Sequence, residues 1–129
     1  MTPNATRKKN ILVCDDDQEI LEMIVETLRM NPNYEIISFG NGNAVLEHLK
    51  TNSPPLDLLI LDLWLPDIDS DEMIPIIRQD ATTKDIPIIL ISAIVKIEIV
   101  ADELGVEASL SKPFLLEELE YKVDQLLSN

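Results

Sequence analysis

The sequence contains little of what several classes of protein depend on. It has a single cysteine, Cys14, and only three glycines among its 129 residues. One cysteine cannot form an internal disulfide, and no apolar run follows basic residues within the first thirty positions, as it would in a secretory signal peptide. No stretch approaches the roughly 18 uninterrupted apolar residues of a membrane-spanning helix. These absences predict a cytoplasmic protein with no membrane segment.

Basic residues are also few. Ten lysines and arginines stand against 24 acidic residues, which gives a formal net charge of −14. A surface of that charge repels phosphate polyanions, so direct binding to nucleic acid or to an anionic membrane is not expected. Arg7, Lys8 and Lys9 cluster in a polar leader predicted over residues 1–10, but three positive charges do not reverse the balance. Cations and other proteins are the expected partners.

The residues that are present predict one α/β domain over residues 11–128. Hydrophobic residues make up 46% of the chain, which is enough to build a core. Short apolar segments typical of buried strands alternate with segments whose apolar residues recur at helical spacing. The predicted strands are 11–14, 34–39, 58–63, 88–91 and 108–111, and the predicted helices lie near 18–30, 44–49, 73–77, 97–104 and 115–127. Within the third helix, Pro75 is expected to be tolerated only in the first turn.

This alternation predicts a doubly wound parallel sheet with helices on both faces, because parallel neighbours need crossover helices. In such sheets, ligands bind beyond the carboxyl ends of the strands. Polar side chains gather at those ends in this sequence: Asp15, Asp16 and Asp17 follow the first predicted strand, Asp62 lies near the end of the third, Ser92 ends the fourth, and Lys112 follows the fifth.

Carboxylates packed at one edge raise one another's pKa unless a cation neutralises them. Mg²⁺ suits such a place because it binds carboxylate and phosphate oxygens, and Mn²⁺ could substitute for it. A carboxylate beside a cation, an ammonium and a hydroxyl would supply a nucleophile, charge neutralisation and alignment, which are what phosphoryl transfer requires.

Four segments carry a resemblance to a known family. ILVCDDDQEI, LLILDLWLPDIDS, PIILISA and SLSKPF occur in that order and resemble the motif blocks of the bacterial two-component response-regulator receiver family. The resemblance extends from about residue 11 to residue 127. It implies a stand-alone receiver domain with a flavodoxin-like (βα)5 fold, in which five parallel strands take the order 2-1-3-4-5.

The resemblance also implies roles for individual residues. Asp62 corresponds to the phosphoacceptor, Asp16 to a direct metal ligand, Asp15 to a ligand acting mainly through water, and Trp64 to a ligand through its backbone carbonyl. Ser92 corresponds to the hydroxyl that moves to the phosphoryl group, and Lys112 to the lysine that pairs with it. The peptide bond preceding Pro113 is typically cis in the family. Asp17 matches no site residue and is interpreted as a helix N-cap.

Four positions depart from the family's pattern or vary within it. Ser109 replaces the aromatic residue that commonly swings inward on activation, so a rotating aromatic switch is not expected. Ser70 stands where glycine is common, which suggests a different turn conformation. Trp64 and Ile94 lie two residues beyond the acceptor and the hydroxyl, where both are bulky and apolar. Because neither can orient an attacking water, slow self-dephosphorylation is predicted.

The implied partners are a histidine kinase or a histidine phosphotransfer protein, and a downstream protein that binds the fourth helix, fifth strand and fifth helix. Apolar residues over 94–100 exceed what one helix face can bury, so part of this region is predicted to be a partner surface, or the interface of a homodimer. Mg²⁺-dependent self-phosphorylation and slow self-dephosphorylation are the only reactions expected, without enzymatic turnover.

Three alternatives remain beside this interpretation. The chain could be a phosphorelay carrier, or a degenerate receiver that acts as a constitutive scaffold. It could also be an aspartate-nucleophile phosphohydrolase, although enzymes resembling the haloacid dehalogenase family carry a second aspartate where this sequence has Trp64. Nucleotide binding is disfavoured, because no glycine-rich loop follows any predicted strand.

Overall fold

Strands and helices alternate along residues 7–128, which are the residues that the computed structural model describes. The strands are β1 (Lys9–Cys14), β2 (Tyr34–Phe39), β3 (Leu58–Asp62), β4 (Ile88–Ser92) and β5 (Ala108–Ser111). The helices are α1 (Gln18–Arg29), α2 (Gly42–Thr51), α3 (Ser70–Gln79), α4 (Ile97–Leu104) and α5 (Leu116–Leu127). All strand pairs are parallel and the order is β2-β1-β3-β4-β5, which confirms the predicted flavodoxin-like α/β fold.

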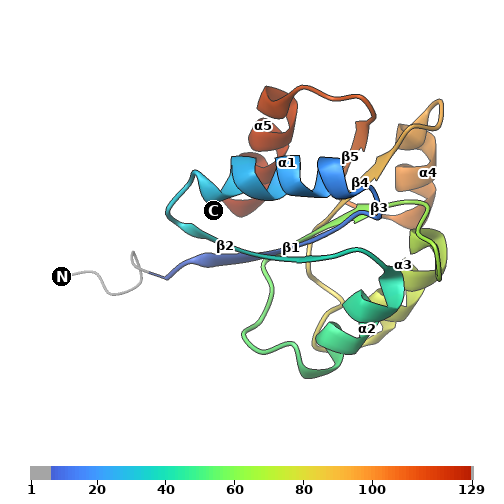
Figure 1. Ribbon diagram of the computed structural model, residues 1–129. Helices are drawn as coiled ribbons and strands as arrows, with labels where there is room; N and C mark the ends of the chain where they lie inside the picture. The colour runs from blue at the N-terminus through green and yellow to red at the C-terminus, as the bar shows by residue number, and fades with distance from the viewer. Residues whose placement is uncertain (1–6, 129) are drawn as a thin grey trace.

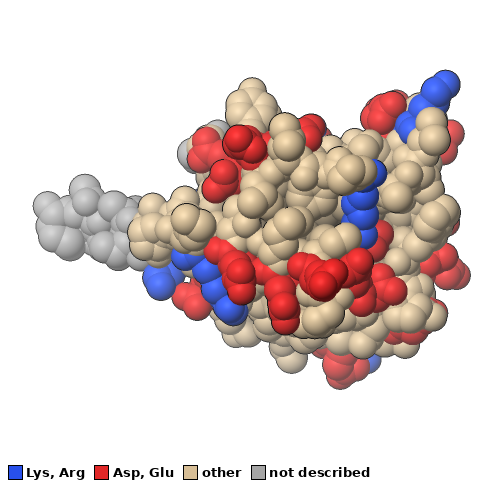
Figure 2. Space-filling view, turned by 45° about the horizontal axis from the view of Figure 1, so that its top comes forward, with Lys and Arg blue, Asp and Glu red and all other residues tan. Residues whose placement is uncertain are grey.

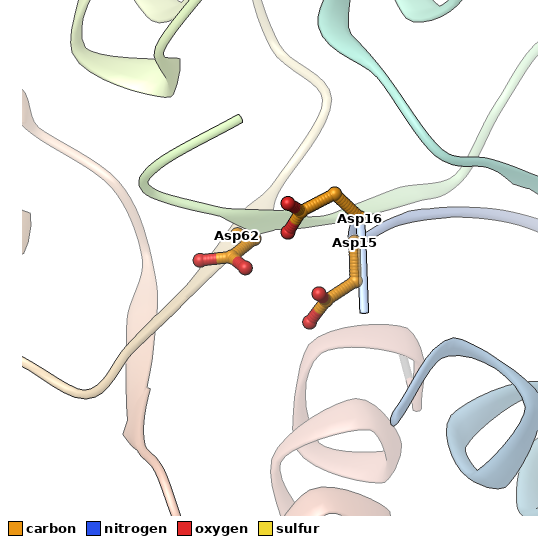
Figure 3. A group of neighbouring side chains, drawn as sticks. All are labelled: Asp15, Asp16 and Asp62. Carbon is orange, nitrogen blue, oxygen red and sulfur yellow. The ribbon is translucent and has the colours of Figure 1, made fainter. Parts of the chain in front are cut away.

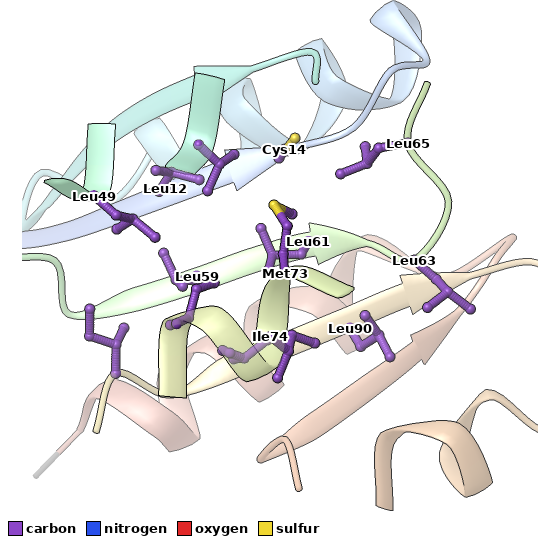
Figure 4. Close-up of a cluster of buried hydrophobic side chains, with 14 of the residues drawn as sticks. Leu12, Cys14, Leu49, Leu59, Leu61, Leu63, Leu65, Met73, Ile74 and Leu90 are labelled. Carbon is purple, nitrogen blue, oxygen red and sulfur yellow. The ribbon is translucent and has the colours of Figure 1, made fainter. Parts of the chain in front are cut away.

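The sheet separates two hydrophobic cores. Helices α1 and α5 lie on one face of the sheet, and α2, α3 and α4 pack against the other (Figure 1). Successive side chains of a strand point to opposite faces, so Leu59 and Leu61 enter one core while Leu58 and Ile60 enter the other. Figure 4 shows the first of these cores, with leucines from β1, β3 and β4 against Met73 and Ile74 of α3. Strands buried on both faces explain the unbroken apolar runs in the sequence.

Most predicted boundaries agree with the structure. Helix α4 and strand β5 have the predicted bounds, and α4 ends at Gly105, whose φ of 72° is the left-handed conformation that glycine adopts without strain. Strand β1 begins at Lys9, two residues earlier than predicted, because Lys9 and Asn10 pair with Tyr34 and Glu35 of β2. Residues 1–6 of the predicted leader lie outside the described residues. Among the helices of residues 7–128, none is long and apolar enough to cross a membrane.

The expectation for Pro75 was wrong. Helix α3 begins at Ser70, so Pro75 is its sixth residue rather than part of its first turn. A proline at this position leaves the carbonyl of Asp71 without its helical partner. Both Asp71 and Pro75 lie on the exposed side of the helix, where water can hydrate that carbonyl. The buried side, with Met73, Ile74 and Ile77, therefore keeps its packing.

Candidate functional site

Three carboxylates meet where β1 and β3 end. Asp15 directly follows β1 and is 1% exposed, and Asp62 is the last residue of β3 and is 6% exposed. Asp16 is exposed at the rim of the same site. Each of the three can offer a carboxylate oxygen within 4.8 Å of the others, and Figure 3 shows the three side chains around one shared space. These residues were predicted to lie at one edge of the sheet, and in the structure their carboxylates lie close together.

Lys112 supplies the positive charge of the site. Its Nζ lies 2.9 Å from Asp62 Oδ2, to which it donates a hydrogen bond, and 2.9 Å from Asp15 Oδ2. The contact with Asp15 is an ion pair without hydrogen-bond geometry, so this buried Oδ2 has no hydrogen-bond partner among the described residues. The other oxygen of Asp15 accepts a bond from the Asp17 N–H at 2.9 Å.

Burial and charge shift the pKa values of this pair. Burial, reinforced by the charge of Asp15, raises the pKa of Asp62 to about 6 against the opposing effect of Lys112. Burial alone would lower the pKa of Lys112, but its contacts with the carboxylates of Asp15 and Asp62 outweigh that effect and raise it. A single ammonium thus faces more carboxylate charge than it can neutralise.

The donor set fits a hard divalent cation. Hard cations such as Mg²⁺ bind oxygen ligands and need few protein carboxylates. Among the described residues, the buried Oδ2 of Asp15 is contacted only by the ammonium of Lys112, so a bound cation, or water on it, would add a second partner for this oxygen. Trp64 follows Asp62 by two residues and is 58% exposed.

Ser92 lies on the neighbouring strand at the same edge. Its side chain is buried, and its hydroxyl oxygen accepts a hydrogen bond from the Ile94 N–H at 3.2 Å. Its carbonyl accepts from the Lys112 N–H at 2.9 Å, which links the ends of β4 and β5. The hydroxyl hydrogen of Ser92 has no acceptor among the described hydrogen bonds, so it remains able to donate to a group on Asp62.

The structure adds Ser70, which the sequence analysis treated only as a departure from a pattern. Ser70 is fully buried at the start of α3, and its hydroxyl donates to the backbone carbonyl of Asp62. Its own N–H donates to the Leu63 carbonyl at 2.8 Å. Its φ is not positive, so this position does not require a glycine. The sequence shows only that a serine follows the acceptor strand. That its hydroxyl bonds the backbone carbonyl of Asp62 is seen only in the fold.

Asp67 is a second residue that the sequence analysis missed. Its carboxylate accepts from the backbone N–H groups of Gly42 and Asn43 at 2.9 and 2.8 Å, which caps α2 from the loop after β3. Desolvation acts to raise the pKa of Asp67, but the Asn43 and Gly42 donors outweigh it and lower the pKa. The loop passes so close that a Cβ on Gly42 would lie 2.8 Å from the Ile68 carbonyl oxygen.

Three further expectations concern residues in or near β1 and β5. Asp17 caps α1 as predicted, because its carboxylate accepts from the N–H groups of Glu19 and Ile20. The peptide bond between Lys112 and Pro113 is cis. Ser109 lies half-buried in β5, paired with Leu90, so no aromatic ring occupies this position.

A five-stranded α/β fold with this acidic cluster and lysine defines the class of receiver domains. The family model of the response regulator receiver domain matches residues 11–124, and the chain belongs to that family. It is therefore the receiver domain of a response regulator in two-component signalling.

Relatives and solved structures agree with this assignment. The chain is 35% identical to the nisin biosynthesis regulatory protein NisR of Lactococcus lactis, over 88% of this chain and 48% of the relative. It is 36% identical to the response regulator ArlR of Staphylococcus epidermidis, over 92% of this chain and 52% of the relative. The Francisella response regulator 1452 receiver domain superposes with a TM-score of 0.82 at 27% identity, covering 92% of this chain and 96% of that one. The chain spans about half the length of the curated relatives it matches.

Proposed function

We propose that Asp62 accepts a phosphoryl group from a phosphohistidine on a histidine kinase or a histidine phosphotransfer protein. The observation that carries this proposal is the contact of Lys112 Nζ with Asp62 Oδ2, beside two further carboxylates. A carboxylate held by an ammonium at the end of a buried strand is accessible from one side and fixed from the other. That arrangement suits a nucleophile whose product carries additional negative charge.

Asp15, Asp16 and Asp62 would hold Mg²⁺, or Mn²⁺ in its place, together with the backbone carbonyl of Trp64. When bound, the cation would neutralise the negative charge of the phosphoryl oxygens. Ser70 contributes by holding the backbone of Asp62, because a nucleophile displaced by about 1 Å can lose most of its reactivity.

Phosphoryl transfer would form a bond between phosphorus and one carboxylate oxygen of Asp62 while the bond from phosphorus to the donor imidazole nitrogen breaks. The imidazole leaves with the electron pair of that bond and takes up a proton. Lys112 would move from the carboxylate to the new phosphoryl oxygens. Neither Trp64 nor Ile94 carries a hydrogen-bond acceptor or a base that could orient an attacking water, which supports slow self-dephosphorylation.

The output would come from the region of α4, β5 and α5. A phosphoryl group on Asp62 would attract the Ser92 hydroxyl and so break its bond with the Ile94 N–H, in the loop that leads to α4. With Ser109 in place of an aromatic residue, the movement of this loop would transmit phosphorylation to α4 without a rotating ring.

Slow hydrolysis of the phosphoryl group suits a terminal signalling receiver and a relay carrier equally. Either would act in the cytoplasm.

Intact-protein mass after incubation with acetyl phosphate or phosphoramidate tests the acceptor. We expect the mass of one phosphoryl group to be added only when Mg²⁺ is present. Asp62→Ala should abolish the adduct, whereas Asp85→Asn, a change at a highly exposed carboxylate, should retain it. A folded protein that forms no adduct with either small-molecule donor would favour a scaffold or a receiver phosphorylated only by its kinase. Steady release of phosphate without an adduct would instead indicate a phosphohydrolase.

A further inference from the structure

The loop between β3 and α3 carries one of the proposed cation ligands, the backbone carbonyl of Trp64. In the described part of the chain, this carbonyl accepts no hydrogen bond from another backbone group, so it is available to a ligand. The ends of the loop are well anchored. Ser70 bonds the carbonyl of Asp62, and the side chain of Leu65 is buried in the core shown in Figure 4. The position of the Trp64 carbonyl therefore depends on what holds the rest of the loop.

Asp67 ties this loop to the start of α2. Its Oδ1 accepts from the Gly42 N–H at 2.9 Å, and its Oδ2 accepts from the Asn43 N–H at 2.8 Å. Because both oxygens are held, the orientation of the carboxylate is fixed as well as its distance. Helix α2 also has a cap of its own, since the Asn41 side chain accepts from the Ala44 N–H. Asp67 thus adds a contact between two segments to a helix that is already capped.

Gly42 permits the loop to come this close. It is buried, and a Cβ at this position would lie 2.8 Å from the Ile68 carbonyl oxygen. The φ of Gly42 is not positive, so the position needs the absence of a side chain rather than the conformational freedom of glycine. A methyl group at residue 42 would push the loop away from α2 without removing any charge.

The segment before and at the start of α2 also holds the end of β1. We call residues 39–43 the α2 entry segment. The Asp15 N–H donates to the Phe39 carbonyl at 3.2 Å, and the Cys14 thiol donates to the Asn41 carbonyl at 3.4 Å. Asp15 is itself a proposed cation ligand. The α2 entry segment therefore connects the end of β1 with the loop after β3, and both of these segments carry ligands.

We propose that Asp67 is a positioning residue for the cation. Among the described residues, the acidic group whose oxygens lie within 4.8 Å of one another does not include Asp67, so it acts through the loop and not as a ligand. By holding the loop against the α2 entry segment, it sets where the Trp64 carbonyl lies relative to Asp15 and Asp16. This inference rests on the proposed Mg²⁺ site, and it adds a residue that determines the affinity of that site.

Loss of charge is a separate reason for weaker cation binding, and two further variants isolate it. The formal charge is −14, and acidic side chains spread over the face seen in Figure 2, so one carboxylate is a small part of the general attraction. Asp17 is a matched control, because it follows Asp16 in the chain and its carboxylate accepts backbone N–H groups at the start of α1. Gly42→Ala is the complementary variant, since it displaces the loop while Asp67 keeps its charge.

Titration with Mg²⁺ tests the proposal, followed by the fluorescence of Trp64, the single tryptophan of the chain. The dissociation constant for Mg²⁺ should rise about tenfold in Asp67→Ala and in Gly42→Ala, because residues that orient metal ligands have effects of this size. At about 0.15 M salt, where distant charges are screened, Asp17→Ala should raise it less than about twofold. Circular dichroism checks that each variant is folded.

Formation of the phosphoryl adduct gives a second readout. The Mg²⁺ concentration that gives half of the maximal adduct rate should rise about tenfold in Asp67→Ala, whereas the rate at saturating Mg²⁺ should stay close to that of the wild type. Helix capping alone would lower the stability of the fold and leave both Mg²⁺ measurements unchanged.

Two results would overturn the role of Asp67. An unchanged dissociation constant in Asp67→Ala would leave this residue as a cap of α2 alone. Equal weakening in Asp67→Ala and Asp17→Ala, with Gly42→Ala equal to the wild type, would show an effect of charge and not of position. If Gly42→Ala does not fold, the difference between Asp67→Ala and Asp17→Ala decides the question.

Failure of this inference can be told apart from failure of the proposed function. Unchanged Mg²⁺ affinity in Asp67→Ala, with an adduct in the wild type, removes only the role of Asp67. Weaker Mg²⁺ binding in Asp67→Ala, in a protein whose wild type forms no adduct, removes only the phosphoacceptor role of Asp62. A wild type that binds no Mg²⁺ overturns both the cation site and the positioning role.

Discussion

The two edges of the sheet use charged residues in opposite ways. At the edge where the strands begin, Glu107 Oε1 accepts from the Ile88 N–H at 2.8 Å and from the Arg78 guanidinium at 2.9 Å. Arg78 also donates to the Ile86 carbonyl at 2.7 Å. Asp57 accepts from the Asn10 N–H in the same region, so each of these charges is balanced by donors or acceptors of the backbone. This network joins the starts of strands and serves the fold.

In the acidic cluster at the edge where the strands end, the charges are not balanced. Lys112 is shared between Asp15 and Asp62, the pKa of Asp62 is raised to about 6, and one buried oxygen of Asp15 has no hydrogen bond among the described residues. Charge left uncompensated in the folded state costs stability, but it is available to a ligand. The difference between the edges therefore separates residues that hold the sheet from residues that can bind and react.

Among the described residues, Lys112 is the one whose ammonium contacts the acidic cluster, and its removal should give the largest change in stability. Lys112→Met keeps most of the side-chain volume but leaves two buried carboxylates without a cation, so we expect unfolding free energy to fall by about 3 kcal/mol in EDTA at pH 7.5. Saturating Mg²⁺ should recover much of that loss, because it binds the folded state alone. Chemical denaturation with and without Mg²⁺ measures both effects. A loss that Mg²⁺ does not reduce would contradict the assignment of the carboxylates as metal ligands.

Asp62→Asn should stabilise the protein when no metal is bound. The pKa of Asp62 is about 6 in the folded protein and 3.8 without the fold, so the folded state binds the proton more tightly. The stability that this group contributes is present below about pH 4 and is lost as the pH rises through about 6. Asparagine stays neutral throughout, so the variant should be about 2 kcal/mol more stable at pH 7.5 and nearly equal to the wild type at pH 4. Denaturation at both pH values tests this, and a stabilisation of equal size at both would contradict a titrating Asp62.

The sequence was sufficient for the fold because each element carries its own signal. Unbroken apolar runs marked the strands, helical spacing marked the helices, and Gly105 marked the end of α4. The site residues were predictable as a group, since parallel strands bring Asp15, Asp62 and Lys112 to one edge whatever the details of packing.

Features that depend on contacts between loops were not predictable. The Ser70 hydroxyl bonds a backbone carbonyl 8 residues away in the chain, and the Asp67 carboxylate bonds two backbone N–H groups 24 and 25 residues away. No local sequence pattern predicts such contacts. Pro75 was misjudged because propensity alone cannot show that the freed carbonyl lies on the exposed side of α3. The imbalance of charge at the site likewise required the distances from Lys112 to both carboxylates.

The opposite edge offers a matched test of the comparison. Arg78→Met removes the partner of Glu107 and the donor to the Ile86 carbonyl, with a side chain that is 22% exposed. We expect a loss of about 1.5 kcal/mol, since the carboxylate of Glu107 still accepts from Ile88 and is partly hydrated. Mg²⁺ should leave this loss unchanged, and the phosphoryl adduct by mass should be retained. Recovery by Mg²⁺ would show that the two edges are not independent.

Ser92→Ala should have the smallest effect on stability and a selective effect on response. The change removes one hydrogen bond, from the Ile94 N–H at 3.2 Å, and we expect it to cost less than about 1 kcal/mol. Asp62 should still be phosphorylated, because its contact with Lys112 is intact. The loop before α4, however, would have no hydroxyl to follow the phosphoryl group. Amide hydrogen exchange over residues 93–99 should therefore change on phosphorylation in the wild type and in Ser111→Ala, an exposed control on β5, but not in Ser92→Ala. An unchanged response in Ser92→Ala would mean that the signal leaves the site by another route.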